Sequence, residues 1–241
     1  MLRIENLTKK YGDKLAVDKL SLHIRRGEIY GFIGHNGAGK TTTIKALCGI
    51  LGFDEGEIYI DGISIKEHPI ECKKKLAYIP DNPELYPYMT GMKYLSFIAD
   101  VFGVSEENRM GRIERYTDAF GIKAVLGAPI STYSHGMRQK LAVCSALIHE
   151  PELVVMDEPF VGLDPKASHI LKALMAEHCR RGGAIFFSTH VLEVAEKLCH
   201  KVAIIKDGVL VRSGSMEEVK GDDSLEEVFL ELEGENVNNA D

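Results

Sequence analysis

The sequence lacks a long uninterrupted apolar stretch. No segment approaches the run of about eighteen or more apolar residues that a membrane-spanning helix needs. Residues 1–7 alternate between polar and apolar, as a strand does, instead of forming a signal peptide. We therefore expect a protein that is made and kept in the cytosol, with 45% hydrophobic residues available to fill a globular core.

Cysteine pairs and an excess of positive charge are also missing. The five cysteines are odd in number and scattered, and none belongs to a CxxC pair. This argues against a zinc site, favours a reducing compartment and predicts packing roles for the cysteines. The net charge of −7 argues against nucleic acid as the main partner, so no nucleic acid is expected.

What the sequence does contain is a glycine-rich segment that follows an apolar run. After the apolar residues 29–33, Gly34 is followed by four residues and then by Gly39, Lys40 and Thr41. This is the spacing of a P-loop, whose backbone N–H groups turn inward on a nucleotide β-phosphate. An ordinary glycine-rich turn is the alternative, but apolar residues recur at helical spacing beyond the loop, as a P-loop requires.

The side chains after the loop suit phosphate chemistry. The helix that is expected to open at Lys40 adds the positive end of its dipole to the same anion. Lys40 would reach the β- and γ-phosphates, Thr41 would ligate Mg²⁺, and Thr42 supplies a further hydroxyl near the phosphates.

A second apolar run, residues 153–156, ends abruptly in Asp157 and Glu158. A continuous apolar run is typical of a buried parallel strand, and ligands bind at the carboxyl ends of such strands. Asp157 would then hold the Mg²⁺ that Thr41 also holds, and Glu158 would act as general base toward the attacking water. Two solvated acids after a strand are the alternative.

A third apolar run, residues 183–187, leads into Ser188, Thr189 and His190. A histidine at a strand end is usually structural or simply exposed. We expect this strand to lie beside the one that carries Glu158, which would let His190 contact the γ-phosphate.

The segment between about residues 81 and 150 has helical periods and predicts an all-helical insertion. Within it, the loop 131–137 runs into a helix expected over 138–149. Ser134 stands where a helix N-cap would be. The alternative is a second phosphate-binding helix start, with the Ser134 hydroxyl and the Gly136 N–H aimed at an anion.

Alternating segments predict strands elsewhere. Residues 2–7, 15–24 and 56–60 are candidates for an antiparallel sheet beside the P-loop, and residues 202–213 for a closing hairpin. Tyr11 lies in an otherwise polar turn, where its ring either packs locally or offers a stacking face to adenine.

Together these motifs resemble the ATP-binding cassette family over about residues 1–218. The resemblance implies an α/β fold with a RecA-like P-loop NTPase core, an antiparallel β subdomain and an α-helical subdomain inserted at about 82–150. Residues 219–241 would add a short helix, over 224–233, and a frayed acidic tail.

The resemblance also implies the site. The residues that it assigns to ATP binding are Tyr11, Gly34, Asn36, Gly37, Ala38, Gly39, Lys40, Thr41, Thr42, Asp81, Ser134 and Gly136. The Mg²⁺ ligands would be Thr41, Asp81 and Asp157, and the catalytic residues Glu158, His190 and Lys40. In this family two cassettes pair head to tail, so Ser134 and Gly136 of one subunit complete the site of the other.

The sequence departs from the family pattern in two loops. Asp81 stands where glutamine is usual, and an ionised acid cannot donate hydrogen bonds as an amide does. In the signature loop Tyr133 replaces leucine, His135 replaces the first glycine and Met137 replaces glutamine. These changes bear on the rate and the metal geometry more than on the activity itself.

Residues 85–90, 134–139 and 224–229 resemble the bacterial exporter branch. That branch moves drugs, lipids, polysaccharides or peptide toxins through a separately encoded permease. We expect a peripheral ATPase on the cytoplasmic membrane face, paired with a second cassette, most simply another copy of itself. Tyr86 and Tyr88 either receive the permease's coupling helix or pack locally. A soluble cassette ATPase without a permease and a non-hydrolysing nucleotide sensor are the rival functions.

Overall fold

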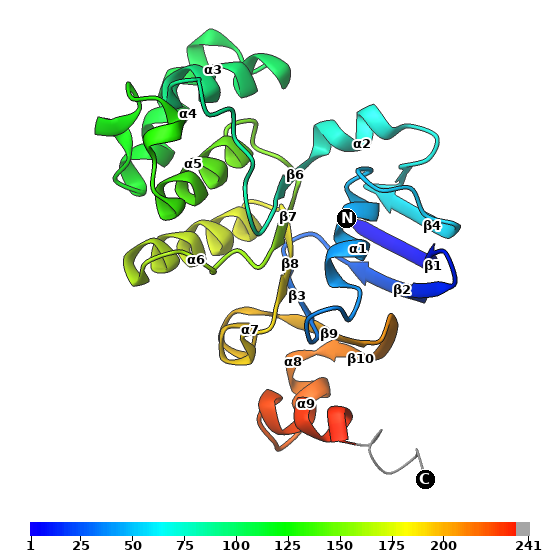
Figure 1. Cartoon of the computed structure of the whole chain (residues 1–241). Coiled ribbons are helices and arrows are strands. Elements are labelled where there is room, and N and C mark those ends of the chain that lie inside the picture. Colours follow the sequence, from blue (N-terminus) through cyan, green and yellow to red (C-terminus); the bar gives the residue numbers. More distant parts are fainter. Residues whose placement is uncertain (235–241) are drawn as a thin grey trace.

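The computed structural model describes residues 1–234 (Figure 1). The strands are β1 (Leu2–Tyr11), β2 (Lys14–Ile24), β3 (Ile29–Ile33), β4 (Glu55–Ile60), β5 (Ile63–Ser64), β6 (Leu76–Ile79), β7 (Leu153–Asp157), β8 (Ala184–Thr189), β9 (Lys201–Lys206) and β10 (Val209–Ser215). The helices are α1 (Lys40–Leu47), α2 (Pro69–Lys75), α3 (Gly91–Val101), α4 (Glu106–Ala119), α5 (His135–Leu147), α6 (Pro165–Arg180), α7 (Leu192–Leu198), α8 (Met216–Lys220) and α9 (Leu225–Gly234), with short 3₁₀ turns η1 (Lys123–Val125) and η2 (Ile130–Thr132). The predicted acidic tail beyond Gly234 lies outside the described residues.

The strands form two sheets. The core sheet has the order β10-β9-β3-β8-β7-β6, in which all neighbours are parallel except the β9–β10 hairpin at one edge. The second sheet, β2-β1-β4-β5, is antiparallel. The predicted α/β core with an antiparallel subdomain is therefore confirmed.

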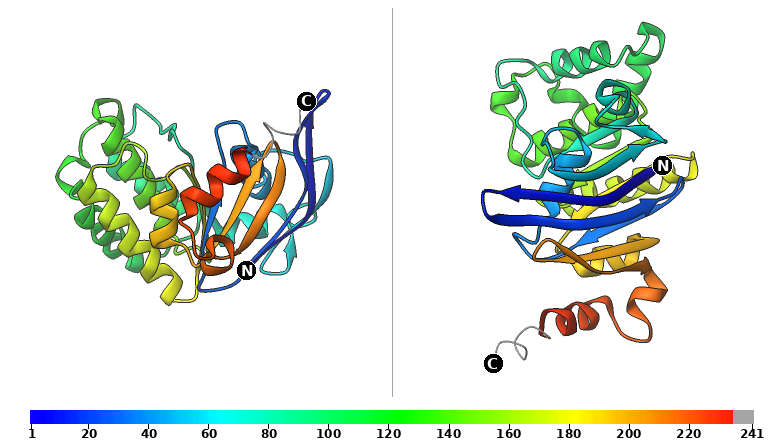
Figure 2. Two further views of the ribbon diagram at one scale, coloured as in Figure 1. Left: turned by 90° about the horizontal axis from the view of Figure 1, so that it is seen from below. Right: turned by 90° about the vertical axis from the view of Figure 1, so that its right-hand side faces the viewer.

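Alternation along the buried strands divides the core in two. On β3, Tyr30 and Phe32 face the antiparallel sheet and α1, whereas Ile29 and Ile33 face the helices on the other side. Successive side chains of a strand point to opposite faces, so an entirely apolar strand fills both cores at once. In Figure 2 (left) the antiparallel strands and the green and yellow helices lie on opposite sides of the core sheet.

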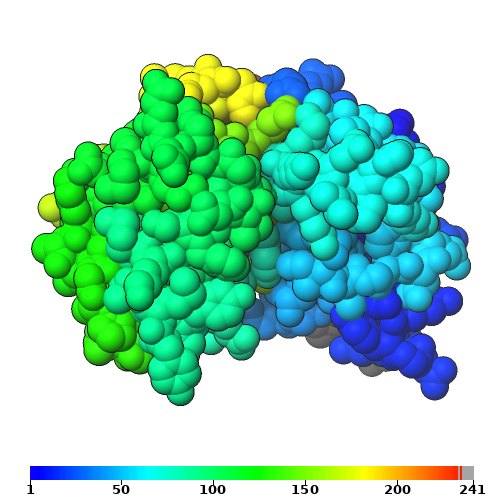
Figure 3. Space-filling view, turned by 90° about the horizontal axis from the view of Figure 1, so that it is seen from above, coloured from blue at the N-terminus to red at the C-terminus, as the bar shows by residue number. Residues whose placement is uncertain are grey.

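The helical segment from α3 to α5 lies between β6 and β7 in the chain, as expected for an insertion. Its buried side chains belong to the same apolar cluster as one face of the core sheet; Leu95 on α3, Ile113 on α4 and Leu141 on α5 share this cluster with Met156 and Phe187. Figure 3 shows the segment, in green, as a mass beside the blue and cyan part of the chain. The segment is thus packed onto the sheet, and its boundary at about 82–150 stays a prediction.

Two local expectations are corrected. Tyr11 is the last residue of β1 and pairs with Lys14 across a two-residue turn, because the strand continues past residue 7. Helix α5 begins at His135, three residues before the expected start, because Ser134 caps it: the Ser134 hydroxyl accepts a hydrogen bond from the Met137 N–H at 3.2 Å.

The five cysteines are free and buried, which confirms their predicted packing role. Within residues 1–234, the helices are all too short or too polar to cross a membrane.

A half-buried histidine makes the stability of the fold sensitive to acid. His149 stacks on Phe102 with the ring centroids 3.7 Å apart, and burial lowers its pKa to about 4 from 6.5. As the pH falls from about 6.5 to about 4, the unfolded chain gains a proton that the folded chain does not bind, so stability falls. Over this pH range we expect the free energy of unfolding of the wild type to fall by about 3 kcal/mol more than that of His149→Phe, which keeps a stacked ring.

Urea unfolding at pH 7 and pH 4 measures the difference. His169→Phe, at an exposed position on α6, is the control and should follow the wild type. If the wild type and His149→Phe lost equal stability in acid, His149 would not be the source of the acid sensitivity.

Candidate functional site

A cleft of about 670 Å³ opens at the carboxyl ends of the core strands. The loop between β3 and α1 forms its floor, and the ends of β6 and β7 form one wall. The predicted site residues that line it are Tyr11, Asn36, Gly37, Gly39, Lys40, Thr41, Thr42, Asp81, Asp157 and Glu158. The topology thus gathers residues from four separate segments into one cavity, where ligands of open α/β sheets bind.

The floor loop has the backbone that the P-loop spacing predicts. Gly37 and Gly39 have φ of 87° and 107°, a region that favours glycine. A Cβ at Gly39 would also lie 2.6 Å from the Ala16 carbonyl oxygen. Glycine at this position therefore allows the loop to turn sharply into α1 while the β1–β2 hairpin lies against it.

The Lys40 amine is buried inside this loop. Its Nζ donates to the carbonyl oxygens of Gly34 at 2.6 Å and of His35 at 3.1 Å. Gly34 itself does not line the cleft, and a Cβ there would meet the Ile205 carbonyl oxygen at 2.4 Å. Ala38, within the same loop, is fully buried and likewise does not line the cleft. The amine is held in the loop by backbone oxygens, directly beneath the space that the loop encloses.

The end of β7 brings the predicted metal ligands together. The Thr41 hydroxyl donates to Asp157 Oδ2 at 2.7 Å, and the Asp157 side chain is buried. The other oxygen, Oδ1, accepts a hydrogen bond from the Ser188 hydroxyl at 2.5 Å. Both oxygens of this carboxylate are therefore fixed in direction.

Glu158 lies between two nitrogen groups. Its Oε2 is 2.9 Å from His190 Nδ1 and also accepts a hydrogen bond from the His190 N–H at 3.3 Å. Its Oε1 is 3.6 Å from Lys40 Nζ, and this buried atom makes no hydrogen bond within residues 1–234. The structure thus brings the side chains of Lys40, Glu158 and His190 together, and one carboxylate oxygen has capacity left for a ligand.

Asp81 extends this acidic wall. Burial raises the pKa of its carboxyl group, and the negative charges of Asp157 and Glu158 raise it further. Within residues 1–234, no cluster of three or more histidine, cysteine or acidic side chains is arranged to hold a metal by itself. Mg²⁺ needs fewer protein ligands, because it retains waters and is bound through one or two carboxylates plus substrate phosphates. The oxygen-only set of Thr41, Asp157 and Asp81, with its unbalanced negative charge, fits that ion.

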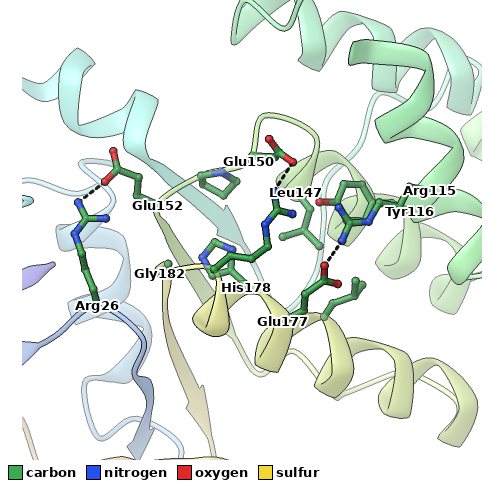
Figure 4. Close-up of a pocket in the computed structure, with 13 residues that line it drawn as sticks. Arg26, Arg115, Tyr116, Leu147, Glu150, Glu152, Glu177, His178 and Gly182 are labelled. Carbon is green, nitrogen blue, oxygen red and sulfur yellow. Dashed lines mark hydrogen bonds and ion pairs between the residues drawn. The ribbon is translucent and has the colours of Figure 1, made fainter. Parts of the chain in front are cut away.

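A second cavity, of about 250 Å³, lies at the amino-terminal ends of the core strands (Figure 4). Its guanidinium groups are already paired with carboxylates: Arg26 with Glu152 at 2.5 Å, Arg115 with Glu177 at 2.6 Å and Arg181 with Glu150 at 3.3 Å. The pair between Arg115 and Glu177 ties α4 to α6 across this end of the molecule.

Comparison with known proteins decides the family. The model of the ABC transporter family matches residues 17–161, which include the floor loop, Asp157 and Glu158. The chain belongs to this family. The resemblance seen in the sequence is thereby confirmed.

Three similar proteins illustrate the relationship. An uncharacterized ABC transporter ATP-binding protein of Bacillus subtilis, YhcH, is 36% identical over 213 residues, which are 88% of this chain and 68% of the relative. The Nod factor export ATP-binding protein I of Burkholderia pseudomallei is 33% identical over 211 residues, which are 88% of this chain and 69% of that protein. A solved ATP-binding subunit of an ABC transporter superposes with a TM-score of 0.93 at 33% identity, covering 97% of this chain and 99% of the other.

The signature loop of the cassette lies away from the chain's own cleft. Ser134 and Gly136 are not among the residues that line it; Ser134 caps α5 as described. His135 packs on the loop after β7, since a Cβ at Gly162 would be 2.5 Å from its ring. Asp164 caps α6 and pairs with Lys140 on α5 at 2.7 Å. These contacts join the signature loop to the neighbouring loop and leave Ser134 exposed.

The cleft is also lined by residues that the sequence did not reveal. Ala16 of the β1–β2 hairpin and Asp207 and Gly208 of the β9–β10 turn line the cleft. The Gly208 N–H donates to the Ala38 carbonyl oxygen at 3.0 Å, which ties this turn to the floor loop. In the sequence Ser188 is only part of a strand end, although a hydroxyl that follows apolar strand residues is a usable signal.

Proposed function

We propose that this cassette hydrolyses ATP and powers export through a separate membrane permease, working as a pair of cassettes. The observation that carries the proposal is the Glu158 carboxylate, held between Lys40 and His190 and beside the Thr41–Asp157 pair. A carboxylate with a free oxygen next to a phosphate-binding amine suits a general base for water attack on a γ-phosphate.

Each residue has one task in this reaction. The inward N–H groups of the floor loop and the Lys40 amine bind the β- and γ-phosphates. Thr41, Asp157 and Asp81 would hold Mg²⁺, which would supply positive charge to offset the negative charge that develops on the phosphate.

Glu158 is the residue that takes part in proton transfer. Its carboxylate accepts a proton from the attacking water, and the His190 side chain and N–H fix the direction of that carboxylate. Because Lys40 lies at hydrogen-bond distance from two backbone oxygens, it can exchange these for phosphate oxygens without moving far.

Pairing of two cassettes would bring Ser134 and Gly136 of one subunit to the cleft of the other. Ser134 and Gly136 lie at the start of α5, outside the chain's own cleft, and Ser134 is exposed. In a head-to-tail pair they would face the nucleotide on the other subunit, so ATP joins the two subunits and hydrolysis releases them. A second copy of this chain is the simplest partner.

The permease contact is proposed on the helical segment. Tyr88 is 94% exposed and Tyr86 is 56% exposed, and Tyr86 packs edge-on against Phe97 of α3. Exposed aromatic groups that gather on one surface indicate an interaction site. A permease contact here would place the chain on the cytoplasmic membrane face, and the likeness to a Nod factor export protein favours export as its direction.

Affinity purification of the tagged chain from detergent-solubilised membranes of its host, at natural expression, tests this role. A stoichiometric polytopic membrane protein is the expected result. Recovery from the soluble fraction alone would contradict the export proposal and leave a soluble cassette ATPase.

The rival role of a nucleotide sensor without turnover is favoured only by Asp81. A phosphate-release assay on purified chain together with its permease separates the two roles. Release of phosphate from ATP supports the enzyme, and stable ATP binding without release supports the sensor.

Adenine stacking is proposed for Tyr11. Its ring is 50% exposed at the cleft, and Lys9 Nζ lies 5.5 Å from the ring centroid. Stacking of a base on an aromatic ring contributes about 1–3 kcal/mol, so Tyr11→Ala should weaken ATP binding about tenfold. Tripolyphosphate, which has no base, should bind the variant almost as it binds the wild type.

Calorimetric titration with both ligands measures this difference. Tyr59→Ala is the matched control, because Tyr59 lies under Arg3 on the antiparallel sheet and does not line the cleft. Equal affinity of the wild type for ATP and tripolyphosphate would rule out stacking.

A further inference from the structure

Ser188 contacts both acidic residues at the end of β7 through one hydroxyl group. It is fully buried on β8, directly across from Asp157 in the parallel register. Its Oγ donates to Asp157 Oδ1 at 2.5 Å and accepts from the Glu158 N–H at 3.0 Å. A hydroxyl has one hydrogen to donate, and here that hydrogen is committed to Asp157.

The contact to Asp157 sets the direction of its carboxylate. With Oδ1 held by Ser188, Oδ2 is the atom that reaches Thr41, at 2.7 Å. A carboxylate whose second oxygen is fixed from behind cannot rotate away from the floor loop. Groups that orient a metal ligand in this way strengthen metal binding although they do not touch the ion.

The contact to Glu158 supports an uncommon backbone conformation. Glu158 has φ of 47°, in the left-handed region, which is strained for a residue with a side chain. Such a conformation persists only where the surroundings fix it. The Ser188 hydroxyl gives the Glu158 N–H a buried acceptor just where the chain leaves the strand, and this turn directs the carboxylate toward Lys40 and His190.

We infer that Ser188 is a positioning residue that couples the two acids, holding Asp157 toward the metal and Glu158 toward the attacking water. The inference rests on the proposed ATPase function and deepens it. Loss of the hydroxyl then affects metal binding and turnover together, because a single atom orients both carboxylates.

A pair of variants of equal shape isolates the hydroxyl. Ser188→Thr keeps the hydroxyl and adds a methyl group, whereas Ser188→Val has the shape of threonine without the hydroxyl. Both crowd the buried site to the same degree, so their difference reports the hydrogen bonds alone. Ser188→Ala adds no volume. It can therefore be tested even if crowding prevents Ser188→Thr and Ser188→Val from folding.

Two readouts are expected to change together. We expect Ser188→Val and Ser188→Ala to bind Mn²⁺ about tenfold to a hundredfold more weakly in the presence of a non-hydrolysable ATP analogue, followed by electron paramagnetic resonance. Steady-state kcat for MgATP should fall by a similar factor. Ser188→Thr should stay close to the wild type in both.

A buried serine elsewhere provides the matched control. Ser145 on α5 is also buried, and its hydroxyl donates to the Ala142 carbonyl oxygen at 2.8 Å, away from the cleft. Ser145→Ala should leave Mn²⁺ binding and kcat unchanged, even if it lowers the urea midpoint as much as Ser188→Ala does.

The outcomes separate this inference from the function on which it rests. Wild-type turnover together with unchanged Mn²⁺ affinity in folded Ser188→Val or Ser188→Ala would overturn the positioning role and leave the ATPase intact. A wild-type chain that takes up no nucleotide with Mn²⁺ would overturn both.

Discussion

Replacing Glu158 with glutamine is expected to lower steady-state ATP hydrolysis by about a hundredfold or more, the usual effect of removing a general base. Glutamine keeps the size of the side chain and can still accept a hydrogen bond from the His190 N–H, but it cannot take a proton from water. ATP affinity should persist, since Lys40 and the floor loop, which are proposed to bind the phosphates, are unchanged.

Phosphate release at saturating MgATP measures turnover, and equilibrium binding of a fluorescent ATP analogue measures affinity. Glu84→Gln is the matched control, because Glu84 is an exposed acid on the wall of the same cleft. It should retain near-normal turnover. Unimpaired hydrolysis by Glu158→Gln would remove Glu158 from the mechanism.

Lys40→Met is expected to abolish high-affinity nucleotide binding. The amine has two backbone oxygens as partners and would exchange them for phosphate oxygens. Hydrogen bonds to charged groups contribute about 1.5–3 kcal/mol each, so the loss of two of them weakens binding about a hundredfold or more. Methionine matches the length of the side chain, so the effect comes from the charge and its donors.

The same binding assay tests this second expectation. Lys45→Met changes an exposed lysine one turn further along α1, also at the cleft, and should weaken binding far less. Comparable affinities of Lys40→Met and the wild type would show that the floor loop does not bind the phosphates in the predicted way.

The sequence was most informative where one residue type is required by local chemistry. The glycines around Lys40 could be placed from spacing alone, because a loop that turns its N–H groups inward has few other solutions. The acids Asp157 and Glu158 were likewise visible, because charge at the end of an apolar strand is conspicuous. Both predictions concern neighbours in the chain.

Contacts between distant segments that no motif marks were beyond such reasoning. Ser188 meets Asp157 because β7 and β8 pair in one register, and a shift of one residue would have turned the hydroxyl to the other face of the sheet. Gly208 reaches the floor loop only through the β9–β10 hairpin. The side of α5 on which Ser134 lies also depends on how the helical segment packs onto the sheet, which periodicity does not specify.

The order of strands in the core sheet affects how the chain is made on the ribosome. Both neighbours of β3 come from much later in the chain, since β8 begins at Ala184 and β9 at Lys201. At translation speeds of about 5–20 residues per second, this apolar strand waits roughly ten to thirty seconds for its first partner. During that time the strand lacks its pairing partners, so chaperones that shield apolar segments of nascent chains should raise the yield of this protein.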